Sequence, residues 1–256
     1  MRLVPLVTES PYVRRARRDR PACRLFCFPF AGAGASTYRD WPGLLPDSVE
    51  VVAVQLPGRE DRLREEAFTA MDPLVRALGQ VLRPYLDLPV ALFGHSGGAL
   101  LAFEVARALV NRSGTVARLV VSGHRAPQLP PRTPPLRDLP DDAFLAEIAA
   151  LDGTDPAVFT DPGLRRVVLP ALRADVAMWE TYRYRPGPPL RGAVTALGGE
   201  HDPLVPVADL REWQAQAGGA FRYRLFPGGH FFLHESPHDI VAAIAEELAM
   251  ADLEAR

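Results

Sequence analysis

The chain has 256 residues, a formal net charge of −2 and 48% hydrophobic residues. This balance excludes a disordered tail and a strongly basic nucleic-acid-binding protein, and the length favours one large domain. All 29 basic residues are Arg, so chemistry that needs a lysine amine, such as a Schiff base, is also excluded. The 26 prolines, about twice the usual share, predict many breaks in regular structure.

Short apolar runs alternate with amphipathic stretches from residue 24 onward. The runs predicted as strands cover residues 24–28, 49–55, 89–93, 117–122, 193–197 and 221–226. The predicted helices cover residues 72–82, 99–109, 138–151, 161–184, 207–216 and 237–253, with Asp72 and Ser236 as expected N-caps. Strands that alternate with helices are typical of a mostly parallel sheet with helices on both faces, which is an α/β fold.

The stretch between residues 126 and 190 breaks this alternation because it contains no predicted strand. Its two predicted helices are bounded by proline-rich segments, and Pro170 predicts a kink in the second helix. A helical insertion of this kind is typical of a lid over a site. We therefore expect residues 128–190 to form a helical lid within a single 1–256 domain, with mobility at 126–136 or 152–162. An ordinary packed helical layer is the alternative.

The N-terminal region predicts neither a signal peptide nor a membrane anchor. Five arginines interrupt it, at positions 14, 15, 17, 18 and 20, and no long apolar run occurs elsewhere. We expect a soluble, cytoplasmic protein in which these arginines form a solvated arm. Cys23 and Cys27 lie on one predicted strand about 13 Å apart, too far for a disulfide, so we expect buried thiols.

Residues 94–98, Gly-His-Ser-Gly-Gly, match the pattern G-x-S-x-G between a predicted strand and a predicted helix. In such a turn the serine occupies a strained position, and the flanking glycines leave room for the neighbouring backbone. The N-terminus of the following helix favours a developing negative charge. We therefore predict Ser96 as a catalytic nucleophile.

A serine nucleophile needs a base and an acidic residue that orients the base. His230 follows the last predicted strand, and Asp202 follows the strand before it, so both lie at the carboxyl edge of the sheet. The chain order Ser96, Asp202, His230 is the order found in α/β hydrolases. We predict these three residues as a triad, with Glu200 as the alternative acid.

Two other motifs do not fit. A serine-protease reading of residues 94–98 requires a histidine and an aspartate before the serine, but His95 is the only histidine that precedes Ser96. Residues 234–238 match the zinc pattern H-E-x-x-H, which needs one continuous helix. Pro237 is compatible only with a helix start, which leaves His234 outside that helix. We therefore expect no metal site.

The oxyanion of an acyl-transfer reaction needs two backbone N–H donors. The first is predicted at Gly97, directly after the nucleophile, and the second in the loop after the first predicted strand. Pro29 has no N–H group. We predict Ala31 as the second donor, with Phe30 as the alternative.

Six segments in order resemble one known family: CFPFAGAGAS, VQLPGRE, GHSGG, LPALRADVAMWETYRY, GGEHDPLV and FPGGHFFL. They resemble the type II (editing) thioesterases of polyketide and non-ribosomal peptide pathways, from about Arg24 to the C-terminus. The resemblance implies an α/β-hydrolase fold, a triad at Ser96, Asp202 and His230, and a mobile helical lid at 136–184. Gly97 departs from the family pattern, which usually has a larger residue such as Met or Leu. We therefore expect a roomier acyl pocket.

The resemblance also implies hydrolysis of acyl groups from the phosphopantetheine arm of an acyl or peptidyl carrier protein, which removes stalled or wrong units. It implies no cofactor and no nucleic-acid partner, and we expect a monomer. A stand-alone carboxylesterase or lipase, an acyltransferase with the same triad, and a non-catalytic binding protein of the same fold are the alternatives.

Overall fold

A computed structural model describes residues 4–113, 116–151 and 157–254. The strands are β1 (Val7–Ser10), β2 (Val13–Arg15), β3 (Cys23–Phe28), β4 (Val49–Val54), β5 (Val90–His95), β6 (Val116–Ser122), β7 (Ala193–Gly199) and β8 (Phe221–Phe226). The α-helices are α1 (Met71–Val81), α2 (Gly97–Ser113), α3 (Asp141–Ala149), α4 (Ala157–Thr160), α5 (Pro162–Thr181), α6 (Val207–Arg211), α7 (Phe232–Glu235) and α8 (Pro237–Glu254).

The strands form one sheet in the order β1-β2-β4-β3-β5-β6-β7-β8. From β4 to β8 every pair of neighbours is parallel, whereas β1 and β2 join the edge antiparallel. Each parallel pair is connected through a crossover, so the carboxyl ends of the parallel strands meet at one edge. The predicted mostly parallel α/β architecture is confirmed.

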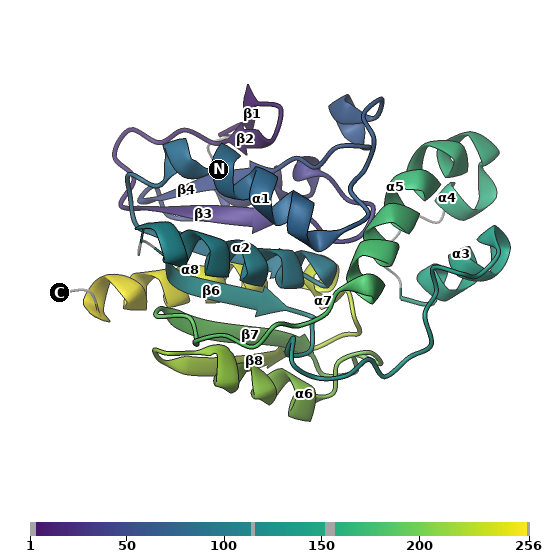
Figure 1. The fold of residues 1–256 in the computed structure, drawn as a ribbon. Helices are drawn as coiled ribbons and strands as arrows, with labels where there is room; N and C mark the ends of the chain where they lie inside the picture. Colours follow the sequence, from purple (N-terminus) through teal and green to yellow (C-terminus); the bar gives the residue numbers. More distant parts are fainter. Residues whose placement is uncertain (1–3, 114–115, 152–156, 255–256) are drawn as a thin grey trace.

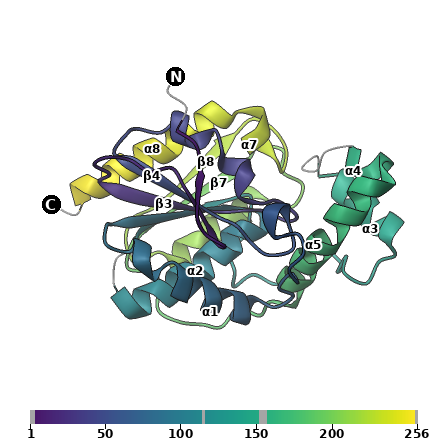
Figure 2. The same cartoon turned by 90° about the horizontal axis from the view of Figure 1, so that it is seen from above.

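Helices cover both faces of the sheet. Figure 2 shows α1 and α2 on one side and α8 on the other. Successive side chains along a strand point to opposite faces of the sheet, so they join the two apolar cores in turn. On β3, Phe26 and Phe28 join the core beneath α1 and α2, while Leu25 and Cys27 join the core beneath α8.

Helices α3, α4 and α5 follow β6 and precede β7, and together they project beyond the carboxyl edge of the sheet (Figure 1). They have a small apolar core of their own, formed by Phe144, Leu145, Ile148, Leu172 and Val176. Ala31, in the loop after β3, packs against this core. The predicted helical insertion therefore contacts the loop that was expected to supply an oxyanion donor. Residues 152–156 of the expected mobile stretch 152–162 lie outside the described residues.

Only part of the N-terminal arginine cluster is solvated as expected: Arg17 and Arg20 are exposed, whereas the other three arginines are buried or half-buried. Arg14 is 8% exposed and lies in β2, which extends the sheet beyond the predicted strands. Arg17 and Arg18 pair with Glu9 and Asp47 at 2.6 and 2.7 Å. The prediction failed for the buried and half-buried arginines because ion pairs with distant carboxylates cannot be read from local charge.

Several predicted helix boundaries also differ: for example, the helix predicted at 99–109 spans Gly97–Ser113, and the one predicted at 161–184 ends at Thr181. Asp72 is not an N-cap, because α1 begins before it and its carboxylate accepts a hydrogen bond from Arg185 at 2.9 Å. The helix predicted from 138 begins at Asp141, since Pro140 holds an extended backbone (ψ 154°). The helix predicted at 207–216 changes to a 3₁₀ turn after Arg211.

The predicted start of the last helix at Pro237 is confirmed, and the two cysteines are buried and not joined by a disulfide. Within the ranges described above, no helix is both long enough and apolar enough to cross a membrane.

Candidate active site

Ser96 lies in the sharp turn between β5 and α2 and has a positive φ of 51°. A non-glycine residue adopts this left-handed conformation only when its surroundings enforce it. Here the enforcement is close packing: a Cβ at Gly98 would lie 2.5 Å from the carbonyl oxygen of Phe28, and a Cβ at Gly94 would lie 2.0 Å from that of Gly98. The two flanking glycines are therefore required by backbone contact, as the G-x-S-x-G pattern predicts.

The structure brings Ser96, His230 and Asp202 together. His230 Nε2 lies 3.0 Å from Ser96 Oγ, and His230 Nδ1 lies 2.9 Å from Asp202 Oδ2. His230 is 3% exposed and Asp202 9%. The other Asp202 oxygen accepts backbone N–H groups of Leu204 and Val205, which fixes the carboxylate. This is the geometry in which a carboxylate orients an imidazole, and the imidazole accepts a proton from a hydroxyl.

His95 lies directly beside His230, with 5.2 Å between the ring centroids. Its Nδ1 lies 3.0 Å from Ser122 Oγ, and burial lowers the pKa of its imidazole well below the usual value. The rings of Phe30 and Phe231 pack against it. His95 is therefore neutral and adds no positive charge next to His230.

The N–H groups expected to hold an oxyanion differ from their neighbours in whether they already donate a hydrogen bond. Gly97 is the first residue of α2, and the first N–H groups of a helix have no acceptor within the helix. In the loop after β3, the N–H of Gly32 donates to Asp175 at 2.9 Å and that of Ala33 to Phe30 at 3.1 Å. Among the described residues, the N–H groups of Phe30 and Ala31 have no recorded acceptor, so both predicted donors remain candidates.

A buried ion pair connects this loop to the helical insertion. Arg59, after β4, donates to both carboxylate oxygens of Asp175 on α5, at 2.5 and 2.9 Å, and the two side chains are 5% and 2% exposed. Arg59 also donates to the carbonyl of Ala33, and Asp175 accepts from Gly32. The conformation of residues 32–33 therefore depends on α5.

Trp179, also on α5, occupies the space beside Gly97. A Cβ built at Gly97 would lie 2.0 to 2.2 Å from three ring carbons of Trp179, so the indole fills the position of an ordinary side chain. Trp179 Nε1 is buried and has no acceptor among the described residues. The expectation of a roomier pocket at Gly97 is wrong, because a distant residue replaces the missing side chain.

The alternatives considered from the sequence are not placed at this site. Glu200 is exposed, whereas Asp202 contacts His230. His234 lies in α7 and His238 in α8, with a break at Ser236, so the H-E-x-x-H pattern does not lie on one helix. The described residues contain no cluster of His, Cys, Asp and Glu suited to a metal ion.

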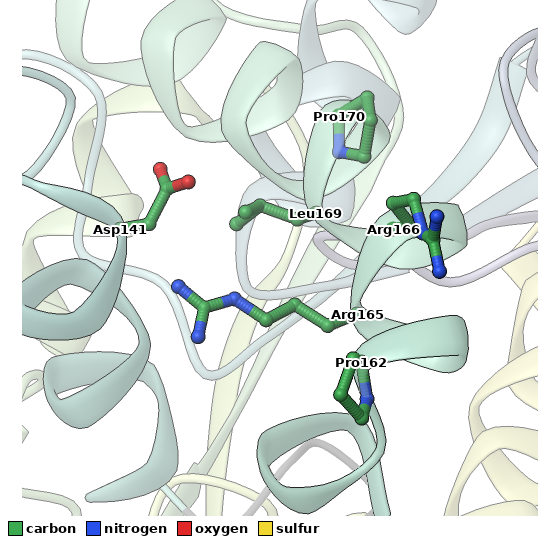
Figure 3. Close-up of a pocket in the computed structure, with 6 residues that line it drawn as sticks. All are labelled: Asp141, Pro162, Arg165, Arg166, Leu169 and Pro170. Carbon is green, nitrogen blue, oxygen red and sulfur yellow. The ribbon is translucent and has the colours of Figure 1, made fainter.

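Two open hollows lie along α5, away from Ser96. One has a volume of about 460 Å³ and lies within the helical insertion, where Figure 3 shows the side chains of Arg165 and Leu169 turned toward Asp141. The second, of about 410 Å³, lies between α5 and the loop around Leu63. Neither is lined by Ser96, Asp202 or His230.

Local sequence patterns do not reveal the roles of Arg59, Asp175 and Trp179. The first two lie 116 positions apart, and no local pattern pairs them. The sequence feature that indicates a residue such as Trp179 is Gly97, because a missing side chain in a crowded turn implies that another residue fills the space.

Comparisons with known proteins point to one family. Residues 23–248 match the family model of the thioesterase domain. The sequence is 37% identical to the gramicidin S biosynthesis protein GrsT of Aneurinibacillus migulanus, over 89% of each chain. It is 42% identical to thioesterase PikA5 of Streptomyces venezuelae, over 95% of this chain and 88% of that one.

A solved structure, the type II thioesterase BorB from the borrelidin biosynthetic cluster, superimposes with a TM-score of 0.83. It is 38% identical, with 94% of this chain and 98% of that chain covered. RedJ, a thioesterase from the prodiginine pathway of Streptomyces coelicolor, has a TM-score of 0.81 and 39% identity over 89% and 86% of the two chains. The predicted α/β-hydrolase fold is confirmed.

Proposed function

The chain belongs to the thioesterase family and is a thioester hydrolase, and we propose that its substrates are acyl groups on the phosphopantetheine arm of an acyl or peptidyl carrier protein. Relatives are named for gramicidin S biosynthesis and for the borrelidin cluster, and the similar structures ClbQ and YbtT come from NRPS/PKS pathways. In such pathways chains grow as carrier-bound thioesters. This chain removes aberrant or stalled acyl units in such a pathway. The observation that carries the proposal is the unbroken hydrogen-bonded series Ser96, His230, Asp202 at a strained turn.

The reaction has two steps. His230 accepts the Ser96 proton while Oγ attacks the thioester carbonyl, and the C–S bond breaks as the thiol takes that proton from His230. Water then attacks the acyl-enzyme with His230 again as base, which releases the carboxylic acid and restores Ser96. The distances of 3.0 and 2.9 Å around His230 support this assignment.

The tetrahedral intermediate carries a negative charge that needs two fixed donors. The N–H of Gly97 and the N–H of Ala31 fill this role. Support comes from the start of α2 at Gly97 and from the hydrogen bonds that engage the N–H groups of Gly32 and Ala33 but leave Ala31 available. Because Asp175 and Arg59 hold this loop, they position the second donor without contacting substrate.

Residues 128–190 act as a lid over the site. Their helices lie at the carboxyl edge of the sheet, where Ser96, Asp202 and His230 are found (Figure 1). The small core of the insertion joins α3 to Leu172 and Val176, which follow Pro170 in α5. The last turns of α5 are held by Asp175 and by the Tyr182 hydroxyl, which donates to Glu104 at 2.6 Å. Motion of the outer part, which is α4 and the start of α5 before Pro170, admits the long pantetheine arm.

A panel of carrier proteins loaded with different acyl groups tests the function directly. Intact-mass spectrometry should show loss of the acyl group and recovery of the free phosphopantetheine thiol, at a rate well above that of the matching oxygen ester. A preference for oxygen esters would instead indicate a carboxylesterase. Acyl transfer to an added alcohol or amine, in place of hydrolysis, would indicate an acyltransferase.

A further inference from the structure

We infer that Trp179 determines which acyl groups the enzyme accepts, by limiting the width of the substrate next to the reacting carbonyl. The inference rests on the proposed function and assigns a role to a residue outside the triad. Its basis is the contact between the Trp179 indole and Gly97, where no side chain other than hydrogen fits while the ring is present.

The position of the ring defines what it can contact. Gly97 follows the nucleophile, and its N–H is one of the two groups proposed to hold the oxyanion, so a ring against the Gly97 Cα lies close to the reacting carbon. The leaving thiol must lie on the side of His230, which protonates it, and the recorded ring contacts of His230 are with His95 and Phe231. The ring of Trp179 therefore borders the side occupied by the first carbons of the acyl group.

The indole is held by the helix that carries it. Asp175, one turn before, is fixed by Arg59 and Gly32, and Tyr182, in the next turn, is fixed by Glu104. The neighbouring Met178 is 1% exposed in the main core. Since Trp179 Nε1 has no acceptor among the described residues, hydrogen bonding does not explain why the ring is here, and its shape does. Trp179 thus stays in place when the outer part of the helical insertion moves.

Acyl groups that are slender next to the carbonyl, such as acetyl, propanoyl and butanoyl, pass this ring. Groups that are branched or cyclic at that position, such as 2-methylpropanoyl and benzoyl, collide with it. Removing a clash with one methyl branch or ring in an apolar site changes kcat/KM by roughly tenfold or more.

The test compares butanoyl-pantetheine with 2-methylpropanoyl- and benzoyl-pantetheine, the first two being isomers. For Trp179→Ala we expect kcat/KM for the branched and cyclic groups to rise at least about tenfold relative to butanoyl. Trp179→Leu and Trp179→Phe should give graded smaller shifts, and they decide the question if Trp179→Ala does not fold. If the folded variants keep the ratio of kcat/KM for the branched and cyclic groups to kcat/KM for butanoyl within twofold of wild type, the inference is overturned.

A double-mutant cycle tests the contact itself. Gly97→Ala should lower kcat/KM at least about tenfold in wild type, because the new Cβ displaces the indole, and should lose most of this effect in the Trp179→Ala background. Additive effects would contradict the proposed contact. Met178→Ala, which loosens the same turn from the core side, is the control and should leave the acyl ratios unchanged.

The outcomes separate the two proposals. If wild type hydrolyses none of the thioesters, the proposed function fails. If wild type hydrolyses butanoyl-pantetheine and the variants keep its acyl preference, only the role of Trp179 fails.

Discussion

At the scale of single residues, the site depends on backbone contacts that exclude side chains. Ser96 keeps a φ of 51° because β5, α2 and the end of β3 approach one another at Gly94 and Gly98. The pattern G-x-S-x-G predicted this turn, and the order of the chain predicted that Asp202 and His230 would reach it. Gly97 marked a missing side chain, but its partner Trp179 was not predictable, because no local pattern describes how α5 packs against the turn before α2.

The first prediction concerns Gly98→Ala. Its Cβ would lie 2.5 and 2.6 Å from the carbonyl oxygens of Phe28 and Pro29, so the turn must shift. We expect a loss of about 1–3 kcal/mol in the free energy of unfolding and a marked fall in kcat. Urea denaturation measures the loss. Gly229→Ala is the control, since a Cβ there meets nothing within 4 Å, and equal stability of the two variants would refute the argument.

At the scale of elements, the helical insertion is not uniform. Helix α3 shares a small core with Leu172 and Val176 of α5, and this part of α5 is also joined to the sheet domain by the Arg59–Asp175 pair and by Tyr182. None of the described residues of α4 belongs to that core. The sequence predicted the helices and the proline at the junction, since helical spacing and proline act locally. It could not predict the ion pair, which depends on how α5 is placed over the loop after β4.

Asp175→Ala should be strongly destabilising, because it leaves the Arg59 charge buried without its partner. We expect a loss of about 3–5 kcal/mol in the free energy of unfolding, with a lower kcat from the loosened Gly32 loop. Asp142→Ala is the matched control: Asp142 pairs with Arg165 at 2.7 Å, but its side chain is 90% exposed. It should cost less than about 1 kcal/mol, and similar losses from both variants would show that burial of the Arg59 pair has little effect.

At the scale of the whole molecule, acid should destabilise the fold through buried histidines. Burial lowers the pKa of His95 well below 6.5 and that of His124 to about 4. Below pH 6.5 the unfolded chain binds protons that the folded chain does not. The free energy of unfolding therefore falls from pH 6.5 toward pH 4, by up to about 1.4 kcal/mol per pH unit for each of these histidines. Urea denaturation at stepped pH should show this fall, and a smaller one for His124→Gln. A flat profile between pH 6.5 and 5 would contradict the pKa assignment.

The charge of the surface leads to a further prediction. The whole chain has a net charge of −2, but exposed arginines lie along the helical insertion, at Arg132, Arg166 and Arg183. Because carrier proteins are commonly acidic, we expect these arginines to speed their association. We expect kcat/KM for an acyl-carrier protein to fall with added salt, and kcat/KM for an acyl-pantetheine to stay nearly constant. The same salt response for both substrates would mean that charge does not guide docking.

Much of the architecture could be predicted because strands and helices alternate with clear periodicity from Arg24 onward. The edge strands β1 and β2 were missed because they are only four and three residues long, and because two of the three residues of β2 are arginines. These arginines pair with Asp61 and Glu50, which lie elsewhere in the chain. Sequence order thus predicted the sheet and the three residues Ser96, Asp202 and His230 that the structure brings together. Contacts between distant segments decided the surroundings of Ser96.

The central claim is that Ser96 forms an acyl-enzyme, and trapping that species tests it most directly. Wild-type enzyme mixed with an acyl-pantetheine, quenched in acid within milliseconds and digested, should give a peptide in which Ser96 carries the mass of the acyl group. Ser96→Ala should give no such peptide and should lose about 10⁴-fold or more in kcat with an unchanged fold. An acyl adduct on another residue, or near-normal turnover by Ser96→Ala, would contradict the account.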